Sequence, residues 1–381
     1  DHARVLSPRM ICYPGFACNL RCRFRYYLES LESGTTENRS TARVQRQLRM
    51  GRRLGKTQVE FTGGEPTIRR DCEELIRYAR SCGYEEVGLI TNGLRMARRE
   101  FSERLVDAGL NDVLFSFHSY DPSVHDWLTR VPGSHAKLRQ AVEHMRDLGV
   151  GFRFNSVVTS ANYRDLDAHM EFLLGFGPRS INLIVFNPSE ETHDYQSHDA
   201  IRFSSYEDLG AHLSPVVRKY RDRVEALNVR FMPFCFMKGL EDHQRHYWQA
   251  IYERKEWDPL LHMLYRMGWW RTMGAAALGM ALVPWTATRY GKKGVYTLLA
   301  EAMQSFRVRL LFRQVPACRE CALRLICPGF HRDFLKAFGA PDVYPYREMP
   351  LVTNPVLFAM KRYGGRFEGE AMRLGPKAPR D

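Results

Sequence analysis

Two groups of cysteines are the residues whose types and spacing are best suited to chemistry. Cys18 and Cys22 are separated by three residues near the start of the chain. Further on, Cys318, Cys321 and Cys327 follow a Cys-x2-Cys-x5-Cys spacing. Nine cysteines among 381 residues are too few for a disulfide scaffold, and such short spacings are typical of metal sites in a reducing compartment. The cysteines therefore predict metal binding at two places.

Small and polar motifs follow apolar runs between these two groups. Gly63-Gly64-Glu65-Pro66 comes directly after the run 58–62, and Thr91-Asn92-Gly93 ends the run 87–90. Ser116 and Asn155 lie at the end of, and within, two later runs. We expect these runs to be strands, and in a barrel of parallel strands the chemistry lies at the carboxyl ends. The motifs therefore predict one site, built from several strand ends and the first cysteine loop.

The loop and the strand-end motifs together resemble those of radical SAM enzymes, closely over roughly residues 10–235. That family binds a [4Fe–4S] cluster through a Cys-x3-Cys-x2-Cys motif in which an aromatic residue precedes the last cysteine. In this sequence Cys18 and Cys22 match the first two cysteines, and Phe24 matches the aromatic residue. The resemblance implies that three thiolates bind three irons, which leaves the fourth iron open for S-adenosylmethionine (SAM). Arg25 occupies the third position, and a guanidinium has no lone pair with which to ligate iron.

The resemblance also implies roles for the other residues. Phe24 would lie against the adenine of SAM, while Gly63 and Gly64 would let the backbone approach its methionine end. The Glu65 carboxylate or nearby carbonyls would take its ammonium group. The ribose and carboxylate of SAM would be faced by Asn92, Ser116 and Asn155. His118, at a strand end, either faces the substrate or packs in the pocket.

The second cysteine group resembles the SPASM and twitch extensions of the same family, which carry an auxiliary [4Fe–4S] cluster. The resemblance implies a fourth ligand upstream, for which Cys235 is the first choice and His331 the second. Tetrahedral zinc held by the same four cysteines is the alternative.

The elements that must position these residues alternate between strands and helices. The spacing predicts strands over 9–13, 58–62, 86–91, 112–116, 151–159, 180–186 and 228–236. Apolar periodicity predicts helices over 71–81, 98–108, 134–148, 162–174 and 206–227. Such alternation indicates a parallel sheet with crossover helices, and the resemblance implies a partial (β/α)6 TIM-type barrel with a C-terminal iron–sulfur extension. The predicted domains are a barrel over 10–235, a helical apolar segment over 236–310, a cluster region over 311–340 and a tail over 341–381.

Composition sets bounds on the partners. The formal net charge is +13 and 44% of the residues are hydrophobic, as in a globular protein that could bind anions. The basic residues are spread along the chain, so nucleic acid is not the expected partner. No secretion signal is recognised at the start of the sequence, and we expect a cytoplasmic protein. The apolar segment 268–285 is too short to span a bilayer, which leaves a buried helix or a helix at the membrane surface.

Two hypotheses for function follow. The first is an active enzyme that cleaves SAM reductively and abstracts hydrogen from a substrate, with ferredoxin or flavodoxin as the electron donor. The second is a catalytically degenerate relative that acts as a binding or partner module, because Arg25 replaces a cluster cysteine. The substrate is expected to be a peptide or a hydrophobic small molecule.

Overall fold

The computed structural model describes residues 8–24, 38–187, 200–246 and 308–352. Contacts divide the chain into two compact units. The barrel unit consists of residues 12–244 and 331–344, and the second unit consists of residues 1–11, 245–330 and 345–381.

The strands form an eight-stranded sheet in chain order from β1 to β8. From β2 to β7, neighbouring strands pair in parallel, which requires a crossover between each two of them. The strands are β1 Arg9–Gly15, β2 Gln58–Gly63, β3 Glu86–Thr91, β4 Asp112–Ser116, β5 Gly151–Val158, β6 Ser180–Val185, β7 Ala226–Arg230 and β8 Gln244–Arg245. The α/β fold of the partial TIM-type barrel, predicted from the sequence, is thereby confirmed.

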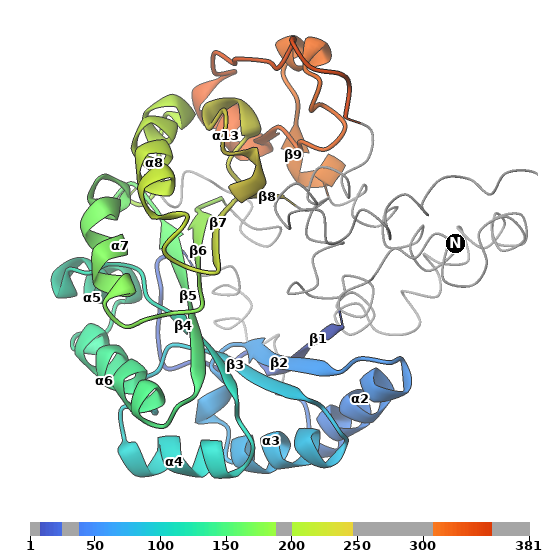
Figure 1. Ribbon diagram of the computed structural model, residues 1–381, viewed down its shortest axis with the longest axis vertical. Coiled ribbons are helices and arrows are strands. Elements are labelled where there is room, and N and C mark those ends of the chain that lie inside the picture. Colours follow the sequence, from blue (N-terminus) through green and yellow to red (C-terminus); the bar gives the residue numbers. More distant parts are fainter. Residues whose placement is uncertain (1–7, 25–37, 188–199, 247–307, 353–381) are drawn as a thin grey trace, which may run out of the picture. The chain divides into compact units, whose positions relative to one another are not determined.

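The crossover helices cover the outer face of the curved sheet in the barrel unit (Figure 1). The helices are α2 Thr41–Arg53, α3 Cys72–Ser81, α4 Arg99–Asp107, α5 Pro122–Thr129, α6 Ser134–Asp147, α7 Leu166–Leu174, α8 Tyr206–Tyr220 and α13 Arg332–Phe338. Short 3-10 turns are η1 Pro66–Ile68, η2 Tyr163–Asp165, η4 Phe234–Phe236 and η5 Glu241–His243. Helices α2, α5 and α13 lie where the sequence had predicted none.

An aromatic core fills the space between the sheet and the helices. Phe117 lies 6.0 Å from Phe154 of β5 and 5.1 Å from Phe172 of α7, measured between ring centroids. Burying one such side chain contributes about 1.5–3 kcal/mol. Because side chains alternate along a strand, the burial of Phe154 on the helix side places Arg153 and Asn155 on the opposite face.

That opposite face carries a buried ionic cluster. The Arg153 guanidinium bonds the Glu60 carboxylate of β2 at 2.5 Å and also bonds both oxygens of Asp112 in β4. Burial lowers the pKa of Arg153, but the charges of Glu60 and Asp112 outweigh it and raise that pKa above its ordinary value. The cluster ties three strands together below the strand ends.

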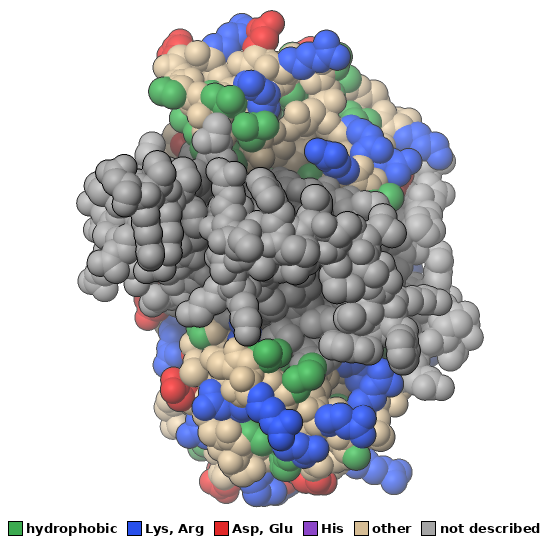
Figure 2. Space-filling view, turned by 90° about the vertical axis from the view of Figure 1, so that its right-hand side faces the viewer, with side chains coloured by type: hydrophobic (Ala, Val, Ile, Leu, Met, Phe, Trp, Pro, Cys, Tyr) green, Lys and Arg blue, Asp and Glu red, His purple; other side chains and the backbone are tan. Residues whose placement is uncertain are grey.

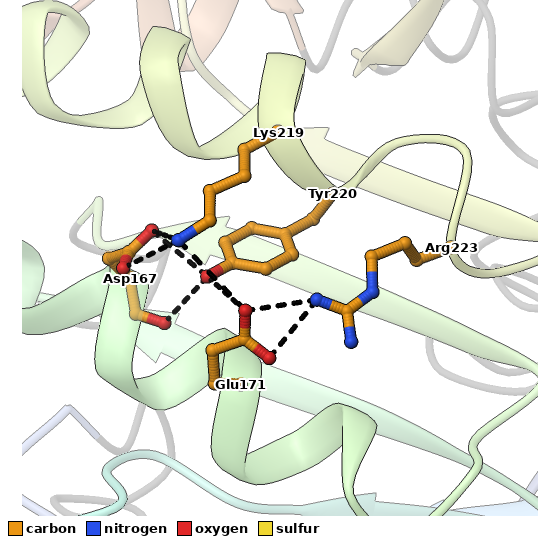
Figure 3. A network of polar contacts seen from close by, with 5 residues as sticks. All are labelled: Asp167, Glu171, Lys219, Tyr220 and Arg223. Carbon is orange, nitrogen blue, oxygen red and sulfur yellow. Dashed lines mark hydrogen bonds and ion pairs between the residues drawn. The ribbon is translucent and has the colours of Figure 1, made fainter.

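A second polar network holds α8 against α7 on the outside of the barrel (Figure 3). Lys219 donates to Asp167 at 2.8 Å, and the Tyr220 hydroxyl donates to Asp167 and Glu171 at 2.9 and 3.0 Å. Arg223 contacts both carboxylate oxygens of Glu171. The charged groups are about half exposed, so salt screens their attraction, whereas Tyr220 is buried. We call this network the helix clamp.

The second unit contains the C-terminal cysteines. Its described part includes β9 Phe312–Arg313 and the 3-10 helix η6 Pro316–Glu320, and β9 pairs with β10 Phe330–His331. No helix within the described residues is long and apolar enough to cross a membrane. The apolar segment 268–285 lies outside them. On the described surface in Figure 2, Lys and Arg side chains are more prominent than Asp and Glu, in keeping with the net charge of +13.

Candidate functional site

The first cysteine loop lies against α5 and the end of β3. The Arg21 and Arg23 amides donate to the Thr129 and Leu128 carbonyls at 3.2 and 2.9 Å. Cys22 is buried and Cys18 is partly buried. The Leu20 amide lies 3.4 Å from the Cys18 sulfur. Backbone hydrogen bonds therefore fix the conformation of the loop that carries Cys18 and Cys22.

The glycines after β2 allow this loop to approach. The Gly64 and Glu65 amides donate to the carbonyls of Gly15 and Ala17 at 3.0 and 2.8 Å. A Cβ on Gly64 would lie 2.0 Å from the Ala17 oxygen, and Gly63 has φ of 120°, a conformation that suits glycine. The two glycines therefore let the end of β2 approach the cysteine loop closely, and their expected approach to SAM stays a prediction.

Glu65 joins the ends of β2 and β3. Its buried carboxylate accepts hydrogen bonds from the Thr67 amide at 3.1 Å and the Thr67 hydroxyl at 2.5 Å. It also accepts from the Thr91 hydroxyl at 2.7 Å and the Asn92 amide at 2.8 Å. Burial raises the pKa of Glu65, and these bonds oppose that rise. With its oxygens engaged, this carboxylate serves as a structural tie.

Asn92 connects that tie to the cysteine loop. Its side-chain Nδ2 donates to Asn19 Oδ1 at 2.8 Å and lies 3.8 Å from the Cys18 sulfur. Cys18, Glu65 and Asn92 therefore lie at the same edge of the sheet.

Phe24 packs on a neutral histidine. Its ring lies 4.7 Å from the His118 ring in an edge-to-face arrangement. His118 Nδ1 accepts from the Val157 amide at 3.2 Å, and burial lowers the pKa of His118 to about 3. Of the two roles considered for His118, the geometry favours packing in the pocket.

A row of polar side chains crosses the inner face of the sheet from the end of β4 to the middle of β7. Ser116, Asn155, Asn182 and Asn228 are register partners on β4, β5, β6 and β7. Asn182 Nδ2 donates to Asn155 Oδ1, and Asn228 Nδ2 donates to Asn182 Oδ1, both at 2.8 Å. We call Asn155, Asn182 and Asn228 the asparagine ladder. The sequence analysis singled out Asn155 but missed the other two, although asparagines inside apolar strands are a signal that could have found them.

The second cysteine group forms a pair of tight turns. The Cys321 amide donates to the Cys318 carbonyl at 3.1 Å, and the Cys327 amide donates to Leu323 at 2.9 Å. Burial raises the pKa of Cys318. Cys235 lies in η4 of the barrel unit, so the four-cysteine site stays a prediction.

The thiols of the first loop fall short of a three-thiolate cluster site. Arg25, which occupies the third position, lies outside the described residues. Among the residues that are described, no group of three or more His, Cys, Asp or Glu side chains could hold a metal ion. At the inner face of the sheet, the Ser116 hydroxyl and Asn155 Nδ2 have no hydrogen-bond partner in the described part of the chain.

Comparison with known proteins identifies the barrel. The sequence model of the radical SAM superfamily matches residues 12–197. This segment belongs to the radical SAM superfamily. Its parallel strands and its loop with Cys18 and Cys22 are thereby placed in one family.

Two relatives of this radical SAM segment are named for different activities. A probable GTP 3′,8-cyclase of Sulfolobus acidocaldarius is 32% identical over 45% of this chain and 54% of that protein. A PqqA peptide cyclase of Rhodopseudomonas palustris is 36% identical over 41% of each chain. The chain thus spans about half the length of these curated relatives. Among solved structures, Streptococcus suis SuiB gives a TM-score of 0.48 at 18% identity, over 59% of this chain and 49% of that one.

Proposed function

We propose that the barrel binds SAM at the carboxyl edge of its sheet. The observation that carries the proposal is the convergence of Cys18, Glu65 and Asn92 at this edge in a radical SAM segment. Phe24 would take the adenine, and the backbone at Gly63 and Gly64 the methionine end. The ribose and carboxylate would be held by Asn92, Ser116 and Asn155.

The ammonium group of SAM would be taken by carbonyls near the first loop. Glu65 is one of the candidates that the resemblance offers, but its carboxylate already accepts four hydrogen bonds. Moving it to a ligand would leave donors of Thr67, Thr91 and Asn92 without a partner. The role of Glu65 in this proposal is therefore to fix the strand ends around SAM.

The reaction class that this architecture serves is hydrogen abstraction from a substrate after reductive cleavage of SAM. The family's cofactor supplies that chemistry when three thiolates hold it. This sequence offers Cys18 and Cys22 with Arg25 in the third place. We therefore expect the chain as it stands to bind SAM without cleaving it, which is also what a degenerate binding module would do.

A peptide is the substrate class that we favour. One relative is named as a peptide cyclase and another as a probable GTP cyclase, so the barrel alone does not choose between them. The C-terminal cysteines resemble the extensions that often accompany peptide substrates. A hydrophobic small molecule is the alternative, which rests on the apolar segment 268–285.

We also propose an auxiliary [4Fe–4S] cluster on Cys235, Cys318, Cys321 and Cys327, with zinc as the alternative metal. The order of predicted domains, with a cluster region over 311–340 between an apolar segment and a tail, belongs to this proposal. The support for this proposal is the Cys-x2-Cys-x5-Cys spacing in the sequence, since among the described residues no three such side chains already form a metal site.

An acidic electron carrier such as ferredoxin or flavodoxin, in the cytoplasm, would serve the completed enzyme. Arg21, Arg23 and Arg130 border the cysteine loop, and Arg23 stacks on Trp127 at 3.9 Å. None of the three arginines forms an ion pair with another described residue. Their charge would attract an acidic partner, and raising the salt concentration should slow its reaction. Contact with a membrane surface is a further proposal, which rests on segment 268–285.

Iron and sulfide content after anaerobic reconstitution tests the proposed metal sites. The parent chain should hold about four irons, because one cluster has its ligands, and Arg25→Cys should hold about eight. Cys321→Ala should lose about four irons in either background. A barrel that binds SAM in equilibrium dialysis, with iron unchanged by Arg25→Cys, would disprove the missing-ligand argument. Zinc in place of iron would reject the auxiliary cluster alone.

A further inference from the structure

The asparagine ladder has a direction. An asparagine side chain has one carbonyl acceptor and one amide group with two donors. Asn228 donates to Asn182, and Asn182 donates to Asn155, so each link uses a nitrogen of one residue and the oxygen of the next. The chain of amides therefore ends on Asn155 with its oxygen engaged.

The free end of the ladder is a donor. Asn155 Nδ2 donates to no acceptor in the described part of the chain. It lies beside Ser116, its register partner on β4, whose hydroxyl is likewise without a hydrogen bond among the described residues. Asn155 is partly exposed, whereas Asn182 is buried. The end that can meet a ligand is thus the one nearest the strands that carry Asn92 and Glu65.

We propose that Asn182 and Asn228 are positioning residues, which hold the Asn155 amide so that its nitrogen, and not its oxygen, faces a ligand at the barrel mouth. The ligand group at that point is a hydrogen-bond acceptor, such as a hydroxyl or carboxylate oxygen of SAM. This inference rests on the proposed SAM site and adds to it two residues on β6 and β7.

The physical reason is the cost of turning Asn155 over. If its amide rotated by 180°, its nitrogen would face the nitrogen of Asn182, and one hydrogen bond would be replaced by a contact between two donors. Hydrogen bonds in such a chain also polarise one another. The ladder therefore couples the orientation of Asn155 to those of Asn182 and Asn228, and in the direction seen here it presents the Asn155 nitrogen before the ligand arrives, which lowers the cost of binding.

Equilibrium dialysis with SAM tests the proposal in the full-length parent chain. Asn155→Leu and Asn182→Leu should each raise the Kd about tenfold, since each removes one oriented hydrogen bond. The double variant should bind no more than about twofold more weakly than Asn155→Leu, because Asn182 acts through Asn155. An effect that multiplies to about a hundredfold would show independent contacts and overturn the inference, as would an unchanged Kd in Asn182→Leu.

Two further variants separate positioning from damage to the fold. Asn182→Asp keeps the size and the acceptor for Asn228 but, when ionised, cannot donate to Asn155, so at pH 8 it should weaken SAM binding while the circular dichroism spectrum still matches that of the folded parent. Ser180→Ala, on the same strand and face, should leave the Kd unchanged. If Asn182→Asp binds SAM like the parent, the positioning role is rejected. If the parent itself binds no SAM, the proposed function fails, and this inference fails with it.

Discussion

At the scale of single residues, the structure gives hydrogen-bond partners of polar groups that the sequence could not reveal. Glu65 was expected among the ligands for the ammonium of SAM, yet its carboxylate ties Thr67, Thr91 and Asn92 together. The sequence could place Glu65 at a strand end. It could not show which donors surround the carboxylate, because those come from β3 as well as from the turn after β2.

Buried histidines form a second group of polar residues, and their pKa values can be measured. His118 and His169 have pKa values lowered to about 3, mainly by burial. Burial also lowers the pKa of His125 and His135, which lie 5.6 Å apart between ring centroids. All four are therefore expected to be neutral in the fold, whereas in the unfolded chain they titrate near pH 6.5.

This difference predicts a loss of stability in acid. Below pH 6.5 the unfolded chain takes up protons that the fold excludes, so the free energy of unfolding falls until the pH reaches the folded pKa values. Each fully shifted histidine contributes about 1.4 kcal/mol per pH unit over that window. Urea unfolding of His169→Gln should lose less stability between pH 7 and pH 5 than the parent, by about 2 kcal/mol. Equal losses in the two proteins would contradict the assignment.

At the scale of elements, periodicity located the strands within a few residues but overlooked the helices α2, α5 and α13. α2 buries Val44 and Leu48 as its only large apolar side chains among many arginines, so its pattern is weak. α5 has eight residues and begins at Pro122, which reads as a turn. The strand predicted to reach Phe236 ends at Arg230, because Phe231 takes a φ of 65°, which is not an extended conformation. A 3-10 turn follows at Phe234.

The ionic cluster on the inner face predicts how strongly the strands depend on one another. Arg153→Met removes the only cation that contacts Asp112 among the described residues and leaves the Glu60 and Asp112 carboxylates buried. Breaking such a buried pair costs about 3–5 kcal/mol. Urea unfolding should show that loss, and Asp112→Leu in the same chain should recover part of it. A loss below about 1 kcal/mol would mean that water reaches the cluster.

At the scale of the whole molecule, the fold of the barrel unit could be predicted from the sequence more completely than that of the second unit. Its strand ends could be read from glycines and polar residues after apolar runs, since the parallel sheet repeats one local rule. The asparagine ladder could not, because it depends on register between β5, β6 and β7. The proposed metal site of Cys235 and the three C-terminal cysteines remains a prediction.

Our central proposal is that the radical SAM segment, residues 12–197, has its reductive chemistry stopped at one ligand position. The most direct test measures 5′-deoxyadenosine formed from SAM under strong reductant after anaerobic reconstitution. We predict none above background from the parent chain and clear formation from Arg25→Cys, because the third thiolate completes the loop. Similar rates from the two proteins would contradict the claim, and so would the absence of product from Arg25→Cys when it is fully loaded with iron.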